Sequence, residues 1–149
     1  MKKIFLGVFV ILLSLTSVSF AGEESEFAKK MMKELDIENK GYAIKKDMEV
    51  FSQKEFRAMD INSDGLVSAD EFFEYVCEKS CQEGNCECKS YKNKKDIDYM
   101  KEYWNRVDKD ASGTVTYQEK LESDMETFYG LDYDGDGKIT KEEMEAQFY

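Results

Sequence analysis

The segment DYDGDGKITKEE, residues 132–143, decides the fold, because it sets acidic side chains at alternate positions around two glycines. Two further segments share its pattern, DINSDGLVSADE (60–71) and DKDASGTVTYQE (108–119). Each has Asp at position 1, Asp or Asn at 3, a side-chain oxygen at 5, Gly at 6, Val or Ile at 8 and Glu at 12. We call them loop 2 (60–71), loop 3 (108–119) and loop 4 (132–143), since a weaker copy precedes them.

This spacing fits the chemistry of calcium, a hard cation that takes about 6–8 oxygen ligands at roughly 2.3–2.6 Å. Side chains at positions 1, 3, 5 and 12 and the backbone carbonyl at position 7 can converge on one ion, with a water bridging from position 9. The pattern resembles the EF-hand, and the chain is identified as a member of that calcium-binding family, similar to its compact bacterial secreted type. The ligands that the resemblance implies are Asp60, Asn62, Asp64, Leu66 and Glu71; Asp108, Asp110, Ser112, Thr114 and Glu119; and Asp132, Asp134, Asp136, Lys138 and Glu143.

The resemblance implies an all-α fold of helix–loop–helix repeats in two paired lobes, with short β bridges between paired loops. It also implies about three bound Ca²⁺ ions. Loop 4 has acids at positions 1, 3, 5 and 12, so we expect it to bind most tightly. The alternative, Asp/Gly turns on an acidic surface, explains neither the terminal Glu nor the apolar residue at position 8.

A weaker copy, loop 1, has the sequence DIENKGYAIKKD (36–47). It keeps an acid at positions 1, 3 and 12 and Gly41 at position 6, but position 5 is Lys40. We expect the Lys40 ammonium to point at the cation position and to repel calcium. The alternative is an ordinary helix–turn–helix. Two apolar residues precede every loop at one spacing, which supports a repeat: Met32/Leu35, Phe56/Met59, Trp104/Val107 and Phe128/Leu131.

EF-hands usually pair through position 8, so we expect Val115 to face Ile139 and Val67 to face Ala43. This predicts an N-lobe (22–81, with repeats at 25–50 and 51–81), a cysteine-containing linker (82–95) and a C-lobe (96–149). The chain would have to turn within 48–59 and within 120–131 to bring neighbouring loops together.

Composition excludes several function classes. The 149 residues carry a formal charge of −11, which disfavours nucleic acid and anionic membrane surfaces as partners. Histidine is absent, which removes the commonest general base and nucleophile activator. We therefore predict no catalytic residues and no enzymatic activity.

The N-terminal sequence has the pattern of a targeting segment. Lys2 and Lys3 precede an apolar run over 4–15, and the small residues that end at Ala21 fit a signal-peptidase site. We expect residues 1–21 to be removed and the mature protein to be secreted or periplasmic, without a membrane anchor. The alternative, a retained anchor, would need about 20 apolar residues.

Four cysteines lie where the predicted lobes connect, two at the end of the N-lobe and two in the linker. In an oxidising compartment an even, clustered count favours disulfides, and we prefer Cys77–Cys88 with Cys81–Cys86. The crossed pairing stays open, as does a four-thiolate zinc site.

Three functional interpretations remain. The first is a calcium buffer, or a module that docks on an unidentified protein when loaded. The second is a structural protein that calcium keeps folded. The third is a thiol-disulfide redox protein. Phe72, Phe73, Met144 and Phe148 would form either a docking groove or plain core.

Overall fold

The computed structural model describes residues 23–82 and 94–146, and within these ranges the chain forms six helices and four short strands. In chain order they are α1 (Glu23–Leu35), β1 (Tyr42–Ile44), α2 (Lys45–Met59), β2 (Leu66–Ser68), α3 (Ala69–Gln82), α4 (Lys94–Val107), β3 (Thr114–Thr116), α5 (Tyr117–Leu131), β4 (Lys138–Thr140) and α6 (Lys141–Ala146). Each strand occupies positions 7–9 of one loop. The expected helical repeats with short β bridges are confirmed. No described helix is long and apolar enough to cross a membrane.

Helices α2 and α5 each run without interruption from one loop to the next. α2 joins loops 1 and 2, and α5 joins loops 3 and 4, so the turns expected within 48–59 and 120–131 are wrong. The chain has no proline, and the one glycine in these two helices, Gly130, lies in the last turn of α5. Neither segment therefore contains a helix-breaking residue before its last turn, and each helix continues to the next loop.

Loop pairing follows from these shared helices. β1 pairs with β4, which sets Ala43 opposite Ile139, and β2 pairs with β3, which sets Val67 opposite Val115. The predicted pairs within each half of the chain are wrong. A helix of 15 residues is about 22 Å long, so it holds the loops at its two ends too far apart to bridge. Each loop instead meets a loop from the other half of the chain.

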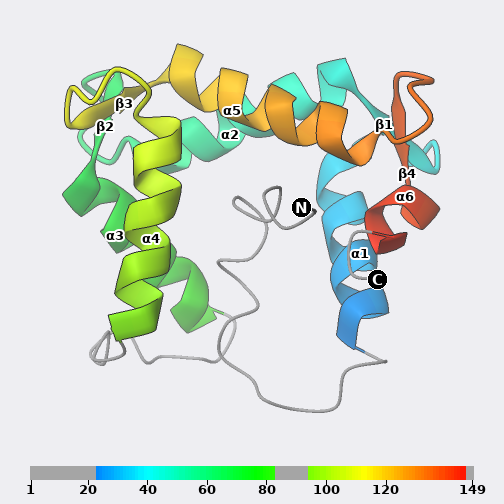
Figure 1. Ribbon diagram of the computed structural model, residues 1–149, viewed down its shortest axis with the longest axis horizontal. Helices are drawn as coiled ribbons and strands as arrows, with labels where there is room; N and C mark the ends of the chain where they lie inside the picture. Colours follow the sequence, from blue (N-terminus) through cyan, green and yellow to red (C-terminus); the bar gives the residue numbers. More distant parts are fainter. Residues whose placement is uncertain (1–22, 83–93, 147–149) are drawn as a thin grey trace.

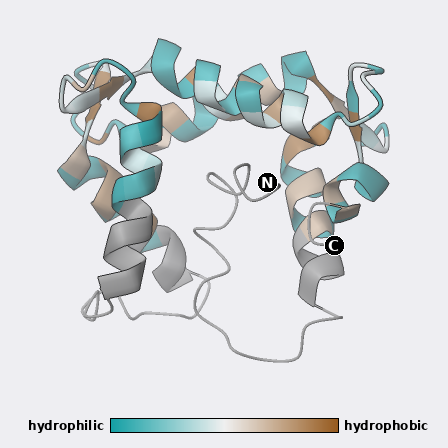
Figure 2. Ribbon diagram, viewed as in Figure 1, coloured by the Kyte–Doolittle hydropathy of each residue, from teal (hydrophilic) through white to brown (hydrophobic). Residues whose placement is uncertain are grey.

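The elements form an arch (Figure 1). α2 and α5 lie side by side along its top, α1 and α6 descend together at one end, and α3 and α4 descend at the other. Figure 2 shows the more hydrophobic segments gathered at the two ends, around the paired strands.

Two buried apolar clusters correspond to these ends. The first contains Ala28, Met31, Met32, Leu35, Ala43, Met48, Phe51, Phe128, Leu131, Ile139 and Met144. The second contains Phe56, Met59, Val67, Phe72, Val76, Tyr103, Val107 and Val115. Both clusters take residues from both halves of the chain, so the segments 22–81 and 96–149 do not each enclose a core of their own. The apolar pairs that precede the loops do face the core, as the repeat predicted.

Helix α5 also buries polar side chains. Lys120 and Asp124 are almost fully enclosed, and the ammonium of Lys120 donates to Asp124 Oδ2. Thr127 Oγ1 donates to the carbonyl of Ser123 at 3.1 Å, and Ser52 of α2 is also fully buried. The interior of the protein therefore includes polar side chains beside the apolar clusters.

Candidate metal-binding loops

The first residue of each loop holds the loop's tight bend together. In loop 2, Asp60 accepts hydrogen bonds from the N–H groups of Asp64 (3.1 Å) and Gly65 (3.0 Å). Asp108 accepts from the same two positions in loop 3, and Asp132 accepts from position 6 in loop 4. Gly65 has a φ of 86°, a left-handed conformation that costs glycine little, and this explains the glycine at position 6.

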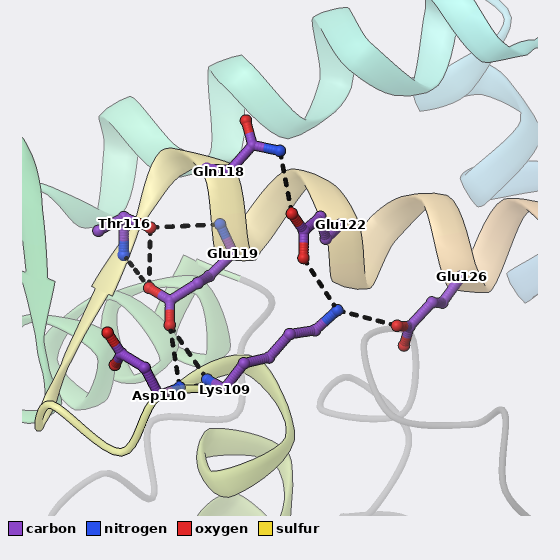
Figure 3. Close-up of polar contacts among 7 residues, drawn as sticks. All are labelled: Lys109, Asp110, Thr116, Gln118, Glu119, Glu122 and Glu126. Carbon is purple, nitrogen blue, oxygen red and sulfur yellow. Dashed lines mark hydrogen bonds and ion pairs between the residues drawn. The ribbon is translucent and has the colours of Figure 1, made fainter.

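The last residue joins the two ends of the loop, as Figure 3 shows for Glu119. One carboxylate oxygen of Glu119 accepts from the backbone N–H of Lys109 (3.1 Å) and of Asp110 (3.4 Å). The other accepts from the N–H and the hydroxyl of Thr116, both at 2.8 Å. Both oxygens therefore already face the loop interior, where a bidentate ligand has to lie.

The same bridge recurs in the other two loops. Glu71 accepts from the N–H of Asn62 and from Ser68, and Glu143 accepts from the N–H of Tyr133 and from Thr140.

These contacts reveal a role that the sequence analysis missed at position 9. Thr116 is the N-cap of α5, and its hydroxyl also accepts from the N–H of Glu119 at 3.3 Å, which completes a capping box. Ligand spacing alone predicts only a bridging water at position 9. The signal was present, because Ser/Thr followed three residues later by Glu is the capping-box motif. Position 9 thus fixes the closing glutamate as well as the start of the outgoing helix.

Hydrogen bonding also sets the charge of the closing glutamates. Bonds from the backbone N–H and the hydroxyl at position 9 hold the pKa of Glu71 and of Glu119 below the usual value. At Glu143 burial is the largest single effect and raises the pKa, but the hydrogen bonds from Thr140, Tyr133 and Asp134 together outweigh it and the pKa is again lowered. All three carboxyl groups are therefore ionised at neutral pH, as calcium ligands must be.

Two of the predicted ligand sets are brought together as acidic groups within the described residues. One is Asp108, Asp110 and Glu119, and the other is Asp132, Asp134 and Asp136. Loop 2, which has Asn62 at position 3, forms no such group of three among the described residues.

The donor chemistry of loop 4 fits calcium. Oδ1 of Asp132 is buried and has no hydrogen-bond partner in the described structure, which is unfavourable for a carboxylate oxygen unless a cation lies against it.

In loop 3, Ser112 Oγ lies 2.9 Å from the carbonyl oxygen of Thr114, so two further predicted ligands face each other. In loop 4, Asp136 also lies near a lysine, because Lys138 Nζ is 3.3 Å from Asp136 Oδ2. The role predicted for the backbone carbonyls of Leu66 and Lys138, at position 7 of loops 2 and 4, stays a prediction.

A lysine ties the start of loop 3 to the outgoing helix (Figure 3). Lys109 Nζ lies 2.9 Å from Glu126 and 3.3 Å from Glu122 of α5, and Gln118 donates to Glu122 at 3.1 Å. The two glutamates are exposed, so water and salt screen these ion pairs and they contribute little to stability.

Loop 1 has the same internal frame as the other three. Asp36 accepts from the N–H of Lys40 (2.8 Å) and of Gly41 (2.6 Å), and Asp47 accepts from the N–H of Ile44 (2.9 Å). Lys40 Nζ lies 2.8 Å from Asp47 Oδ2 and 3.3 Å from a carboxylate oxygen of Glu38. The prediction that this ammonium points at the cation position is confirmed. That loop 1 binds no metal stays a prediction.

The predicted disulfides lie outside what the structure describes. Cys86 and Cys88 fall between the described ranges, and of Cys77 and Cys81 only the backbone, in α3, is described.

Comparison with known proteins supports the interpretation of these loops as EF-hand loops. The family model described as EF hand matches residues 53–72 and 125–149, which cover loops 2 and 4 with parts of their flanking helices. No curated protein matches the chain. Domains of this family bind Ca²⁺, and the acidic groups of loops 3 and 4 are suited to that ion. Together with the four loop–helix repeats, the match supports an EF-hand calcium-binding protein.

Proposed function

We propose that this protein is a non-enzymatic calcium buffer that works outside the cytoplasm and takes up three ions, one in each of loops 2, 3 and 4. The observation that carries the proposal is the acidic group of loop 4, with its buried and unpartnered Asp132 Oδ1. Loops 2 and 3 support it because they share the frame in which position 1 closes the bend and position 12 joins the loop ends.

The chain's own residues would act by orienting the oxygen ligands toward the ion. Ser68, Thr116 and Thr140 orient the closing glutamates, and the glycine at position 6 lets the loop bend tightly. When bound, calcium supplies the positive charge that neutralises the converging carboxylates.

Burial of the apolar side chains favours a buffer over a docking module. Phe72 and Met144, two candidates for a docking groove, are only 3% and 2% exposed. Phe73 is partly buried against the second cluster, and Phe148 lies outside the described residues. A hydrophobic dye should therefore bind no better in calcium than in chelator. Dye binding that develops only with calcium would instead favour the docking module.

Calorimetric titration tests the number of ions. We expect three binding events in the unmodified protein and the loss of one event in each of Glu71→Gln, Glu119→Gln and Glu143→Gln. Asp47→Asn is the matched control, because Asp47 holds position 12 of loop 1, and it should leave three events. A fourth event in the unmodified protein, or the loss of one in the control, would contradict the proposal.

Export is the part of the proposal that rests on sequence alone. If residues 1–21 form a signal peptide, mass spectrometry of the protein expressed with its native N-terminus should find a mature form that begins at Gly22 in the periplasm or medium. Recovery of the full-length chain in the cytoplasm alone would contradict export without touching calcium binding.

A further inference from the structure

Loop 1 is closed in the same way as the calcium loops. Asp36 accepts from the N–H groups at positions 5 and 6, as Asp60 and Asp108 do. Asp47 at position 12 accepts from the N–H at position 9, as the closing glutamates do. Its loop residues nevertheless lack a position-9 hydroxyl, because Ile44 stands there. Something else must help to hold Asp47 in place.

That group is the ammonium of Lys40. It lies between Glu38 at position 3 and Asp47 at position 12, and so joins the first half of the loop to its end. In loops 2–4 the longer glutamate reaches the backbone at position 2 or 3 by itself. The Lys40 side chain is 20% exposed and that of Asp47 only 9%. The hydrogen bond to Asp47 raises the pKa of Lys40, so the group stays positively charged.

Loop 1 is joined to loop 4 through the strands. Ala43 and Ile139 face each other across β1 and β4, and both are fully buried in the first apolar cluster. Order in loop 1 therefore restricts the backbone of loop 4. At the other end of the arch, loops 2 and 3 pair with each other, and position 5 is Asp64 in one and Ser112 in the other. Neither of these side chains carries a positive charge.

We propose that Lys40 is a permanent internal cation that takes the place of calcium in loop 1 and, through the β1–β4 pair, holds loop 4 in its binding conformation before any ion arrives. The two ends of the arch then differ. Loop 4 is preformed, whereas loops 2 and 3 gain their order together when calcium binds. The expected effect on calcium affinity rests on the proposed function. The expected order of the β1–β4 pair without calcium does not depend on it.

The test compares Lys40→Met with Lys141→Met. Lys141 lies at position 10 of loop 4 and pairs with Glu145 at 3.2 Å on the surface. Both variants remove one positive charge near loop 4, which by charge alone should strengthen calcium binding there. Lys40→Met should instead weaken binding at loop 4 by at least about fivefold, the lower end of typical coupling between linked sites. Lys141→Met should leave it unchanged or slightly tighter, and loops 2 and 3 should be unaffected in both.

Amide hydrogen exchange in chelator gives a readout that needs no calcium. In the unmodified protein the amides of β1 and β4 should be protected more strongly than those of β2 and β3. Lys40→Met should remove this difference by exposing β1 and β4 selectively. Unaltered protection, tighter binding at loop 4, or equal loss of protection at both ends of the arch would each overturn the proposal.

A second variant separates the possible failures. Lys40→Asp places a carboxylate at position 5, so calcium should restore the order of loop 1 and a fourth binding event should develop. If calcium does not restore the protection of β1 and β4 in this variant, loop 1 is not held by a cation. If the unmodified protein binds no calcium at all, the proposed function fails, while exchange in chelator still decides the role of Lys40.

Discussion

Val67 of loop 2 lies directly opposite Val115 of loop 3, and both are buried, at 1% and 3% exposure. The two residues hold the same position in loops that belong to opposite halves of the chain. Since paired loops share a β bridge and a core, order in one favours order in the other. Calcium binding should therefore be coupled between loops 2 and 3 and not between loops 3 and 4, although α5 joins the latter.

Disabling loop 3 tests this coupling. Glu119→Gln should weaken calcium binding at loop 2 by about fivefold or more, because loop 3 no longer offers an ordered partner strand. Loop 4 should keep its affinity. NMR titration can follow the amides of Gly65 and Gly137, which report on the two loops separately. Glu143→Gln is the control and should leave Gly65 unaffected; the reverse pattern would favour pairing within each half of the chain.

The ligand positions were predictable because each is fixed by local spacing. Asp132, Asp134 and Asp136 come together in the structure as their alternation implied. The pairing was not predictable in the same way, because position 8 is equally apolar in loops 2, 3 and 4 and does not choose a partner. The choice depends on α2 and α5 being continuous. The signal for a continuous α2 is the absence of proline and glycine from 48–59.

Proline in the middle of α2 tests the shared helix. Gln53 is exposed, so Gln53→Pro would be tolerated if the chain turned between loops 1 and 2. In a continuous helix it removes a backbone hydrogen bond and clashes with the preceding turn, which costs about 3 kcal/mol. Urea denaturation at saturating calcium measures the loss. Gln53→Ala should change stability by less than about 0.5 kcal/mol, and an equally small effect of proline would speak against a continuous α2.

The buried pair of Lys120 and Asp124 could not be recognised as buried from sequence, because a lysine and an aspartate four residues apart usually lie on a helix surface. Its burial follows from the packing of α5. Lys120→Met leaves the Asp124 carboxylate enclosed without its partner, and we expect a loss of about 3–5 kcal/mol in the free energy of unfolding. The double variant Lys120→Met/Asp124→Leu should recover most of this loss. If it does not, packing of the lysine stem, rather than the unpaired charge, sets the cost.

The backbone N–H of Thr116 is the main cause of the lowered pKa of Glu119, and the Thr116 hydroxyl should add to it. Hydrogen bonds from Thr116 lower the pKa of Glu119, so this glutamate contributes stability that is present above its unfolded pKa, near 4.5, and is lost as the pH falls through the lower folded value. Thr116→Val removes the hydroxyl bond and the N-cap. The pKa of Glu119 should rise towards its ordinary value, and the calcium-free protein should lose about 1 kcal/mol of stability at neutral pH.

Both effects can be followed in chelator, by NMR titration of the glutamate side chains and by urea denaturation at several pH values. The stability difference between Thr116→Val and the unmodified protein should shrink as the pH falls below about 4.5, since protonation removes the interaction that the variant lacks. Glu71 is the internal control, because its hydroxyl partner, Ser68, is unchanged. A pKa of Glu119 that does not move would mean that the backbone N–H groups alone set its charge, and Thr116 would then act only as a helix cap.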